Sequence, residues 1–153
     1  MKSLNDWLKE YGESHQHPTN VVIHKVCVPL IMFSLLGLLW CIPQPLLMKS
    51  YHYLNFSVIL IVPCLIFYFF LNLKMFIGMG IASFLMLSGN HVLDYIGQLL
   101  PSSIIIFICA WIVQIWGHRI EGKRPSFLKD LTFLLIGPLW VLRSLYKRLG
   151  IRV

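Results

Sequence analysis

Six histidines are the side chains of this sequence with the clearest capacity for chemistry. His15, His17 and His24 lie near the N-terminus, and His118 follows much later in the chain. Histidine is the commonest metal ligand near neutral pH, and two or three histidines with a carboxylate suit iron, copper or zinc. These residues predict a metal site if the fold brings the two stretches together. The alternative for each ring is an ordinary hydrogen-bonded histidine at a membrane interface.

Two polar residues accompany these histidines at helical spacing. Asn20 lies four residues before His24, and Glu121 lies three residues after His118, so each pair shares one face of a helix. We take Asn20 and Glu121 as candidate catalytic residues, because the two pairs outline a polar pocket under the apolar bundle. The Glu121 carboxylate can act as a general base or as a ligand. The alternative for Glu121 is an ion pair with a nearby base, which would be Arg119, Lys123 or Arg124.

The same three bases form a candidate substrate-binding group. Arg119, Lys123 and Arg124 could hold an acidic lipid head or a fatty carboxylate, since guanidinium and ammonium groups pair with carboxylates. The alternative is that they form a solvated charge cluster that only sets membrane topology.

The composition restricts the class of protein that can carry these groups. Of 153 residues, 58% are hydrophobic and only 12% are charged. A soluble domain has about 25% charged residues, and a domain of this size buries only about two-thirds of its surface. The composition therefore excludes disorder, a secreted disulfide scaffold and an ordinary soluble enzyme. The 13 Lys and Arg against 6 Asp and Glu lie in short segments between apolar runs, which argues for a membrane protein and against nucleic-acid binding.

The apolar runs predict an all-α, multi-pass membrane helical bundle in a single domain, residues 1–153. About four runs are candidates for transmembrane helices; they cover residues 21–42, 56–71, 75–93 and 104–118. Residues 3–15 predict an amphipathic helix that lies flat on the membrane or packs on the protein's own loops. Residues 131–142 are too short to cross alone and are interrupted by Gly137-Pro138, which predicts a C-terminal re-entrant or interfacial helical segment.

The distribution of bases orients this four-span arrangement. Nearly every Lys and Arg falls on one side, and only Lys49 falls on the other. Because cytoplasmic loops carry excess Lys and Arg, we expect an integral membrane protein with both termini in the cytoplasm, in a bacterial inner membrane or the endoplasmic reticulum. His15, His17, His24 and His118 then share the cytoplasmic side, whereas His52 and His91 lie on the far side.

Two stretches of the chain resemble a known family. One is Tyr11-x-x-x-His15 followed by Pro18-x-Asn20-x-x-x-His24 and Pro29. The other is Gln114-x-x-Gly117-His118-x-x-Glu121-Gly122-x-x-Pro125 followed by Gly137-Pro138. Together they resemble the small membrane proteins of the yeast 2-hydroxy fatty acid dioxygenase family. The middle spans match in hydropathy only. The family often has glycine where this chain has Cys27, which puts the helix packing near His24 in question and removes no ligand.

The resemblance implies an Fe(II)-dependent dioxygenase that uses O2 for α-oxidation of a 2-hydroxy fatty acid to a fatty acid one carbon shorter. It also implies that His15, His24 and His118 are the iron ligands. Membrane lipid surrounds such a protein. His17 or His91 stays open as a further ligand, and mononuclear or dinuclear iron, substrate chain length and a homo-oligomer stay open as well.

Two other functions compete with this one. A non-catalytic lipid-binding or scaffolding membrane protein would use the polar cluster only to anchor its helices. A small transporter or channel would need polar residues at mid-membrane, and the predicted spans offer few; these are Ser34, Ser57, Ser83 and Gln114.

Overall fold

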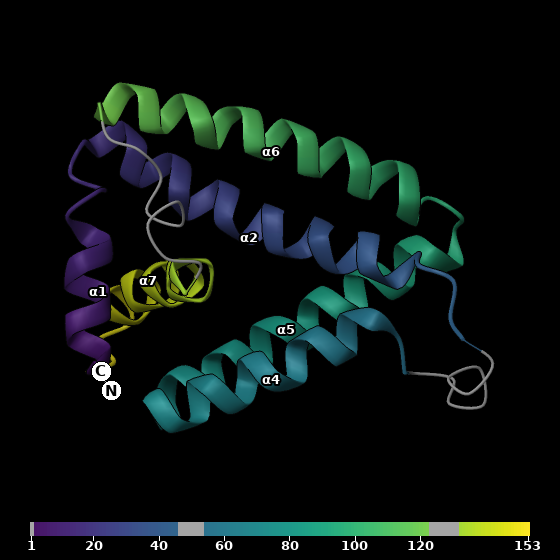
Figure 1. The fold of residues 1–153 in the computed structure, drawn as a ribbon, viewed down its shortest axis with the longest axis horizontal. Helices are drawn as coiled ribbons and strands as arrows, with labels where there is room; N and C mark the ends of the chain where they lie inside the picture. The colour runs from purple at the N-terminus through teal and green to yellow at the C-terminus, as the bar shows by residue number, and fades with distance from the viewer. Residues whose placement is uncertain (1, 46–53, 123–131) are drawn as a thin grey trace.

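The computed structural model describes residues 2–45, 54–122 and 132–153, which form helices with short connections. The helices are α1 (Leu4–Gly12), α2 (Pro18–Trp40), α4 (Phe56–Leu71), α5 (Leu73–Tyr95), α6 (Leu99–Glu121) and α7 (Phe133–Arg148). In Figure 1, α2 and α6 run side by side, α4 and α5 form a hairpin, and α1 and α7 lie together at one end.

The helices have the lengths and surfaces of a membrane protein. Within the described residues, α2, α5 and α6 are each long and apolar enough to cross a membrane. Helix α4 is equally apolar but has only 16 residues. Large apolar side chains stand on the outside of the bundle, such as Phe70 (73% exposed) and Phe84 (69% exposed). The predicted helical membrane protein is therefore confirmed, and the count of four crossings stays a prediction.

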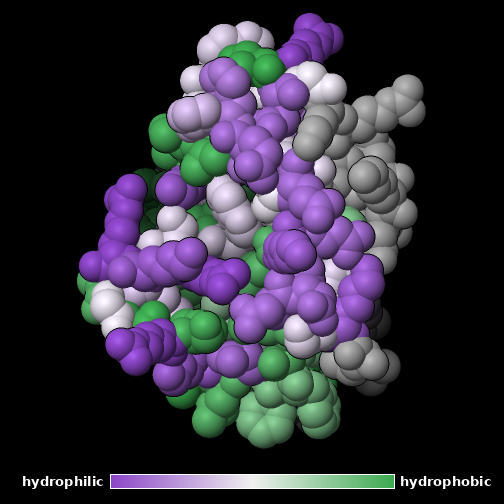
Figure 2. Space-filling model, turned by 90° about the vertical axis from the view of Figure 1, so that its left-hand side faces the viewer, coloured by the Kyte–Doolittle hydropathy of each residue, from purple (hydrophilic) through white to green (hydrophobic). Residues whose placement is uncertain are grey.

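One end of the bundle is polar and holds both chain termini. Figure 2 looks onto this end and shows mostly hydrophilic residues, with a hydrophobic area at its lower edge. Both termini lie at this end in Figure 1. Lys74, in the first turn of α5, donates to the Arg152 carbonyl at 2.6 Å, and Arg143 donates to Asn5 at 3.2 Å. Bases from distant segments therefore gather here, as the charge pattern predicts. Their side of the membrane stays a prediction.

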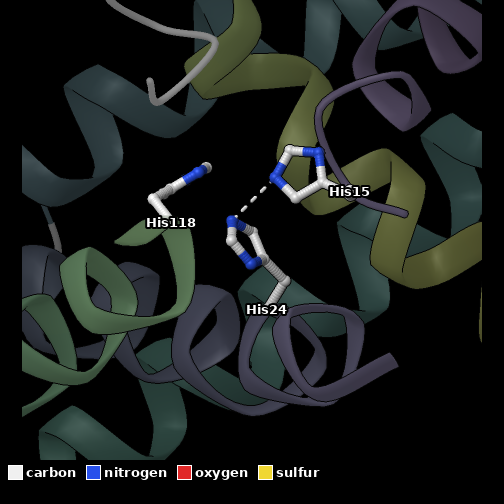
Figure 3. A group of neighbouring side chains, drawn as sticks. All are labelled: His15, His24 and His118. Carbon is white, nitrogen blue, oxygen red and sulfur yellow. Dashed lines mark hydrogen bonds between the residues drawn. The ribbon is translucent and has the colours of Figure 1, made fainter. Parts of the chain in front are cut away.

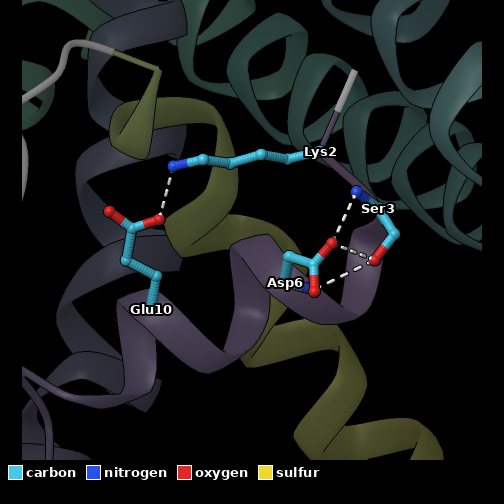
Figure 4. Close-up of polar contacts among 4 residues, drawn as sticks. All are labelled: Lys2, Ser3, Asp6 and Glu10. Atoms are coloured by element: carbon cyan, nitrogen blue, oxygen red, sulfur yellow. Dashed lines mark hydrogen bonds and ion pairs between the residues drawn. The ribbon is translucent and has the colours of Figure 1, made fainter.

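Helix α1 is fixed at both its N-terminus and its apolar face. Figure 4 shows the N-terminal capping box, in which the Ser3 hydroxyl accepts from the Asp6 backbone N–H and the Asp6 carboxylate accepts from the Ser3 backbone N–H. Lys2 and Glu10 form an ion pair at 2.7 Å. The buried residues Leu4, Leu8 and Tyr11 belong to one core cluster with residues of α7, α4 and α5. The amphipathic face therefore packs on the protein itself, mainly on α7, and leaves Tyr11 at the inner end of the helix.

Close packing of α2 against α6 is built on small residues. Gly117 of α6 faces Asn20 and Ile23 of α2, where a Cβ would lie 2.5 Å from Asn20 Oδ1 and 3.2 Å from the Ile23 side chain. Further along, Ile23, Cys27 and Ala110 form a small buried cluster. The thiol at Cys27 is thus accommodated between the two helices, and the ends of α2 and α6 meet beside His24 and His118.

The largest differences from the sequence prediction lie in α6 and α7. Helix α6 begins at Leu99 rather than at residue 104, because Pro101 sits in its first turn, where a missing N–H costs no intrahelical bond. Gly137-Pro138 does not interrupt the C-terminal segment, so that prediction is wrong: α7 continues through both residues to Arg148. Gly137 and Pro138 are buried there, and Gly137 gives space to the Tyr11 ring, whose hydroxyl lies 3.0 Å from where a Cβ would be.

Candidate metal centre

Three buried histidines from three separate segments meet at the polar end of the bundle. His15 comes from the connection after α1, His24 from the second turn of α2, and His118 from the last turn of α6 (Figure 3). Their side chains are 4%, 0% and 6% exposed. One ring nitrogen of each lies within 4.8 Å of the others, in the part of the chain that the structure describes.

Backbone carbonyls fix the rings of His15 and His24. His15 Nδ1 lies 2.6 Å from the Tyr11 carbonyl oxygen, and His24 Nδ1 lies 3.0 Å from the Asn20 carbonyl oxygen. The Tyr11 ring also stacks on the His15 ring, with centroids 4.2 Å apart and an interplanar angle of 14°. A carbonyl oxygen only accepts hydrogen bonds, so each Nδ1 carries the proton and each Nε2 keeps its lone pair.

These two lone pairs face each other. His15 Nε2 and His24 Nε2 are 2.8 Å apart, as the dashed line in Figure 3 marks. Two acceptor nitrogens at this distance repel unless a cation lies between them. The separation is close to the roughly 3 Å between two nitrogen ligands of one transition metal. A proton on one of the two Nε2 atoms would also remove the repulsion. Because the Nδ1 of that ring already carries a proton, the ring would then be a buried imidazolium cation, which is costly. The arrangement therefore fits a shared metal ion.

His118 offers the third donor. Its Nδ1 is buried and has no hydrogen-bond partner among the described residues. Gln114, one helical turn earlier, is also buried, and its Oε1 likewise has no partner in the described ranges. Buried polar atoms are nearly always paired. Two orphaned atoms beside the histidines point to a ligand that completes the site.

The site is built for neutral imidazoles. Burial lowers the pKa of His15 below its ordinary value, so this ring is uncharged at neutral pH and its lone pair is available. Three neutral imidazoles suit zinc, copper, iron and nickel. The residues present therefore fit a metal, and the donor set alone leaves its identity open.

Glu121 lies beside the three histidines and holds the segments that carry them. Its carboxylate oxygens accept from the backbone N–H groups of Gln16 and His17, both at 2.8 Å. It also accepts from Asn20 Nδ2 at 3.1 Å. Glu121 thus joins the end of α6 to the chain on both sides of the α2 N-terminus. Among the described residues, Glu121 accepts hydrogen bonds from these donors and forms no ion pair with a Lys or Arg.

Other predicted site residues lie elsewhere. His17 caps α2, and its Nδ1 accepts from the Thr19 backbone N–H at 3.3 Å. His91 packs near Trp40, at the opposite end of α2 from His24. Arg119 is exposed and does not line the cavity beside the histidines. Lys123 and Arg124 lie outside the described residues.

An apolar cavity of about 200 Å³ adjoins the three histidines. It runs between α2, α6 and α7, and its polar groups are concentrated at the histidine end, where Tyr11 and Gln114 also line it. Sequence reasoning did not assign roles to these two residues. The signal is their position, because each lies four residues before a histidine, His15 or His118. Gln114 shares a helical face with His118, whereas His15 lies in the connection after α1.

These features define a class: an all-helical membrane protein with a buried three-histidine site at the head of an apolar cavity. Comparison with known proteins gives the family. Residues 1–149 match the family described as "2-hydroxy-palmitic acid dioxygenase Mpo1-like", and the chain belongs to it. One relative is the 2-hydroxy-palmitic acid dioxygenase MPO1 of Saccharomyces cerevisiae, which is 28% identical over 150 residues, covering 96% of this chain and 82% of the relative. No solved structure matches the chain.

Proposed function

We propose that this protein is an Fe(II)-dependent dioxygenase that shortens 2-hydroxy fatty acids by one carbon. The observation that carries the proposal is the pair of facing Nε2 atoms of His15 and His24, 2.8 Å apart, with a third buried histidine beside them. The name of the yeast relative, a 2-hydroxy-palmitic acid dioxygenase, supports the substrate class and the reaction type. The fatty acid and O2 are the substrates, and membrane lipid supplies the surroundings.

The proposed reaction balances without a further co-reactant. The 2-hydroxy acid and O2 give the acid one carbon shorter, carbon dioxide and water. The bond between the carboxyl carbon and C2 breaks, and C2 becomes the new carboxyl carbon. Iron, held by His15, His24 and His118, supplies the redox chemistry that lets O2 react with an organic acid.

The chain's own residues orient the substrate. The polar head of the acid lies at the histidine end of the cavity and its tail lies against the apolar walls. The orphaned Gln114 Oε1 accepts a hydrogen bond from the 2-hydroxyl, which distinguishes a 2-hydroxy acid from the plain fatty acid. Asn20 and Glu121 act as positioning residues, because they hold His24 and the chain around His15 rather than facing the cavity.

Metal analysis of the anaerobically purified protein tests the proposal. We expect about one iron per chain, and its loss in His24→Ala and in His118→Ala. His91→Ala is the matched control, because His91 packs near Trp40 and should keep the iron. The iron-loaded protein should then convert 2-hydroxypalmitic acid, and not palmitic acid, to the acid one carbon shorter.

Two results would count against the proposal. A folded wild type that takes up no iron after addition of Fe(II) would favour a non-catalytic lipid-binding or scaffolding protein. Equal loss of stability in both histidine variants, with no metal in any protein, would likewise show that the cluster only anchors helices.

A further inference from the structure

The cavity beside the histidines continues away from them as an apolar groove. On α2 its wall runs from His24 through Val28, Ile31 and Met32 to Leu35. The helix rises about 16 Å between His24 and Leu35. An extended acyl chain advances about 1.3 Å per carbon, so this length matches roughly a dozen carbons.

The groove opens on the surface of the bundle. Leu35 on α2 and Leu134 on α7 line it and are 36% and 49% exposed. Exposed apolar side chains of the neighbouring helices continue this surface, such as Ile108 and Ile112 of α6. A tail already dissolved in the bilayer can therefore enter from the side without passing through water.

A second apolar cavity of about 220 Å³ lies directly behind the far end of the groove. The two cavities share four lining residues and only these: Met32, Leu35, Leu134 and Pro138. The second cavity is otherwise lined by residues of α2, α4, α5 and α7, including Cys64 and Tyr68. The shared side chains thus form a partition between the groove and the space beyond it.

We propose that the groove between α2, α6 and α7 binds the acyl chain of the substrate and that the partition at Met32 limits the length of that chain. The proposal rests on the proposed function for the identity of the acid. It adds the residues that select chain length. In a bilayer the acyl tail is already out of water, so moving it into the groove gains no hydrophobic free energy. A preference for one chain length therefore reports how well the acyl chain fits the groove.

Anaerobic binding tests this without turnover, because O2 is a substrate of the proposed reaction. The full-length protein is titrated in detergent with 2-hydroxy fatty acids from shorter to longer than palmitic acid, and thermal stabilisation is measured. Met32→Ala should shift the best-bound chain by roughly three carbons toward longer acids, matching the three heavy atoms removed. Met86→Ala is the matched control, because Met86 lines neither cavity and should leave the preference unchanged.

A second variant covers the case in which Met32→Ala fails to fold. Leu134→Trp fills the groove from its exposed edge and should shift the preference toward shorter acids. A photoreactive diazirine at the methyl end of 2-hydroxypalmitic acid gives an independent readout. Crosslinks should map near Leu35 in the wild type and reach the second cavity, near Cys64, in Met32→Ala.

The outcomes separate the two proposals. An unchanged length preference in both Met32→Ala and Leu134→Trp would overturn the groove, even if the enzyme oxidises 2-hydroxy acids. Crosslinks spread over the outer faces of the helices, without competition from unlabelled acid, would also overturn it. A shifted preference in a protein that never oxidises the acid would uphold the groove and reject the proposed reaction.

Discussion

At the scale of single residues, two backbone carbonyls decide which nitrogen each histidine offers. The Tyr11 and Asn20 carbonyls each lie four residues before the histidine that they hold. Both rings therefore present Nε2, and both face the same point. Such hydrogen bonds to the nitrogen that does not bind metal usually orient ligands in metal sites. Selection of the tautomer thus follows from the local backbone, which is helical at His24 and is the connection after α1 at His15.

Glu121→Gln tests whether the carboxylate positions the ligands or is itself a ligand. The amide keeps one acceptor oxygen but presents an N–H₂ group to donors from Gln16, His17 or Asn20. Loss of charge-assisted hydrogen bonds should destabilise the fold by about 1–2 kcal/mol. Metal affinity should fall by about 10–100-fold, the usual effect of an outer partner. Thermal unfolding measures the loss of stability, and metal titration measures the loss of affinity.

A different pattern would contradict the positioning role. If Glu121→Gln abolishes metal binding as completely as His118→Ala does, with unchanged thermal stability, then Glu121 binds the metal directly.

At the scale of elements, the contact of α2 with α6 determines how close His24 and His118 lie. Gly117→Ala places a methyl group against Asn20 Oδ1 and Ile23. Overpacking of this kind costs about 1–3 kcal/mol, so the unfolding temperature should fall and metal affinity with it. Gly80→Ala on α5 is the matched control, since nothing lies within 4 Å of its Cβ position. It should be neutral or stabilise by up to about 1 kcal/mol. Equal effects of both variants would refute a specific role for Gly117.

The sequence predicted helices better than their ends. The range 56–71 coincides with α4, because Asn55 and Asn72 cap it on both sides. Helix α6 was predicted too short, since Pro101 was taken as part of a loop and instead occupies the first turn.

For the site, the charge pattern placed His15, His24 and His118 on one side, and the structure brings them together. The three hydrogen bonds of Glu121 could not be predicted, because they depend on the exact register of α6 against α2.

At the scale of the whole molecule, the shared position of the two termini has a topological meaning. Both lie at the polar end of the bundle (Figure 1), which requires an even number of crossings if α2, α5 and α6 all cross. Helix α4, at 16 residues, is then the fourth crossing. Reporter fusions at the N- and C-termini should therefore both report the cytoplasm. Reporters on opposite sides would show that α4 does not cross.

The histidine cluster also fixes an order of events during biosynthesis. Gln16 and Glu121, which are 105 residues apart, are joined directly by a hydrogen bond beside the site. His15 and His24 leave the ribosome early. The three-histidine cluster forms only after α6 has been translated and has packed along α2. Metal loading at the proposed centre would therefore follow the translation of α6, because a chain arrested before α6 carries only two of the three histidines.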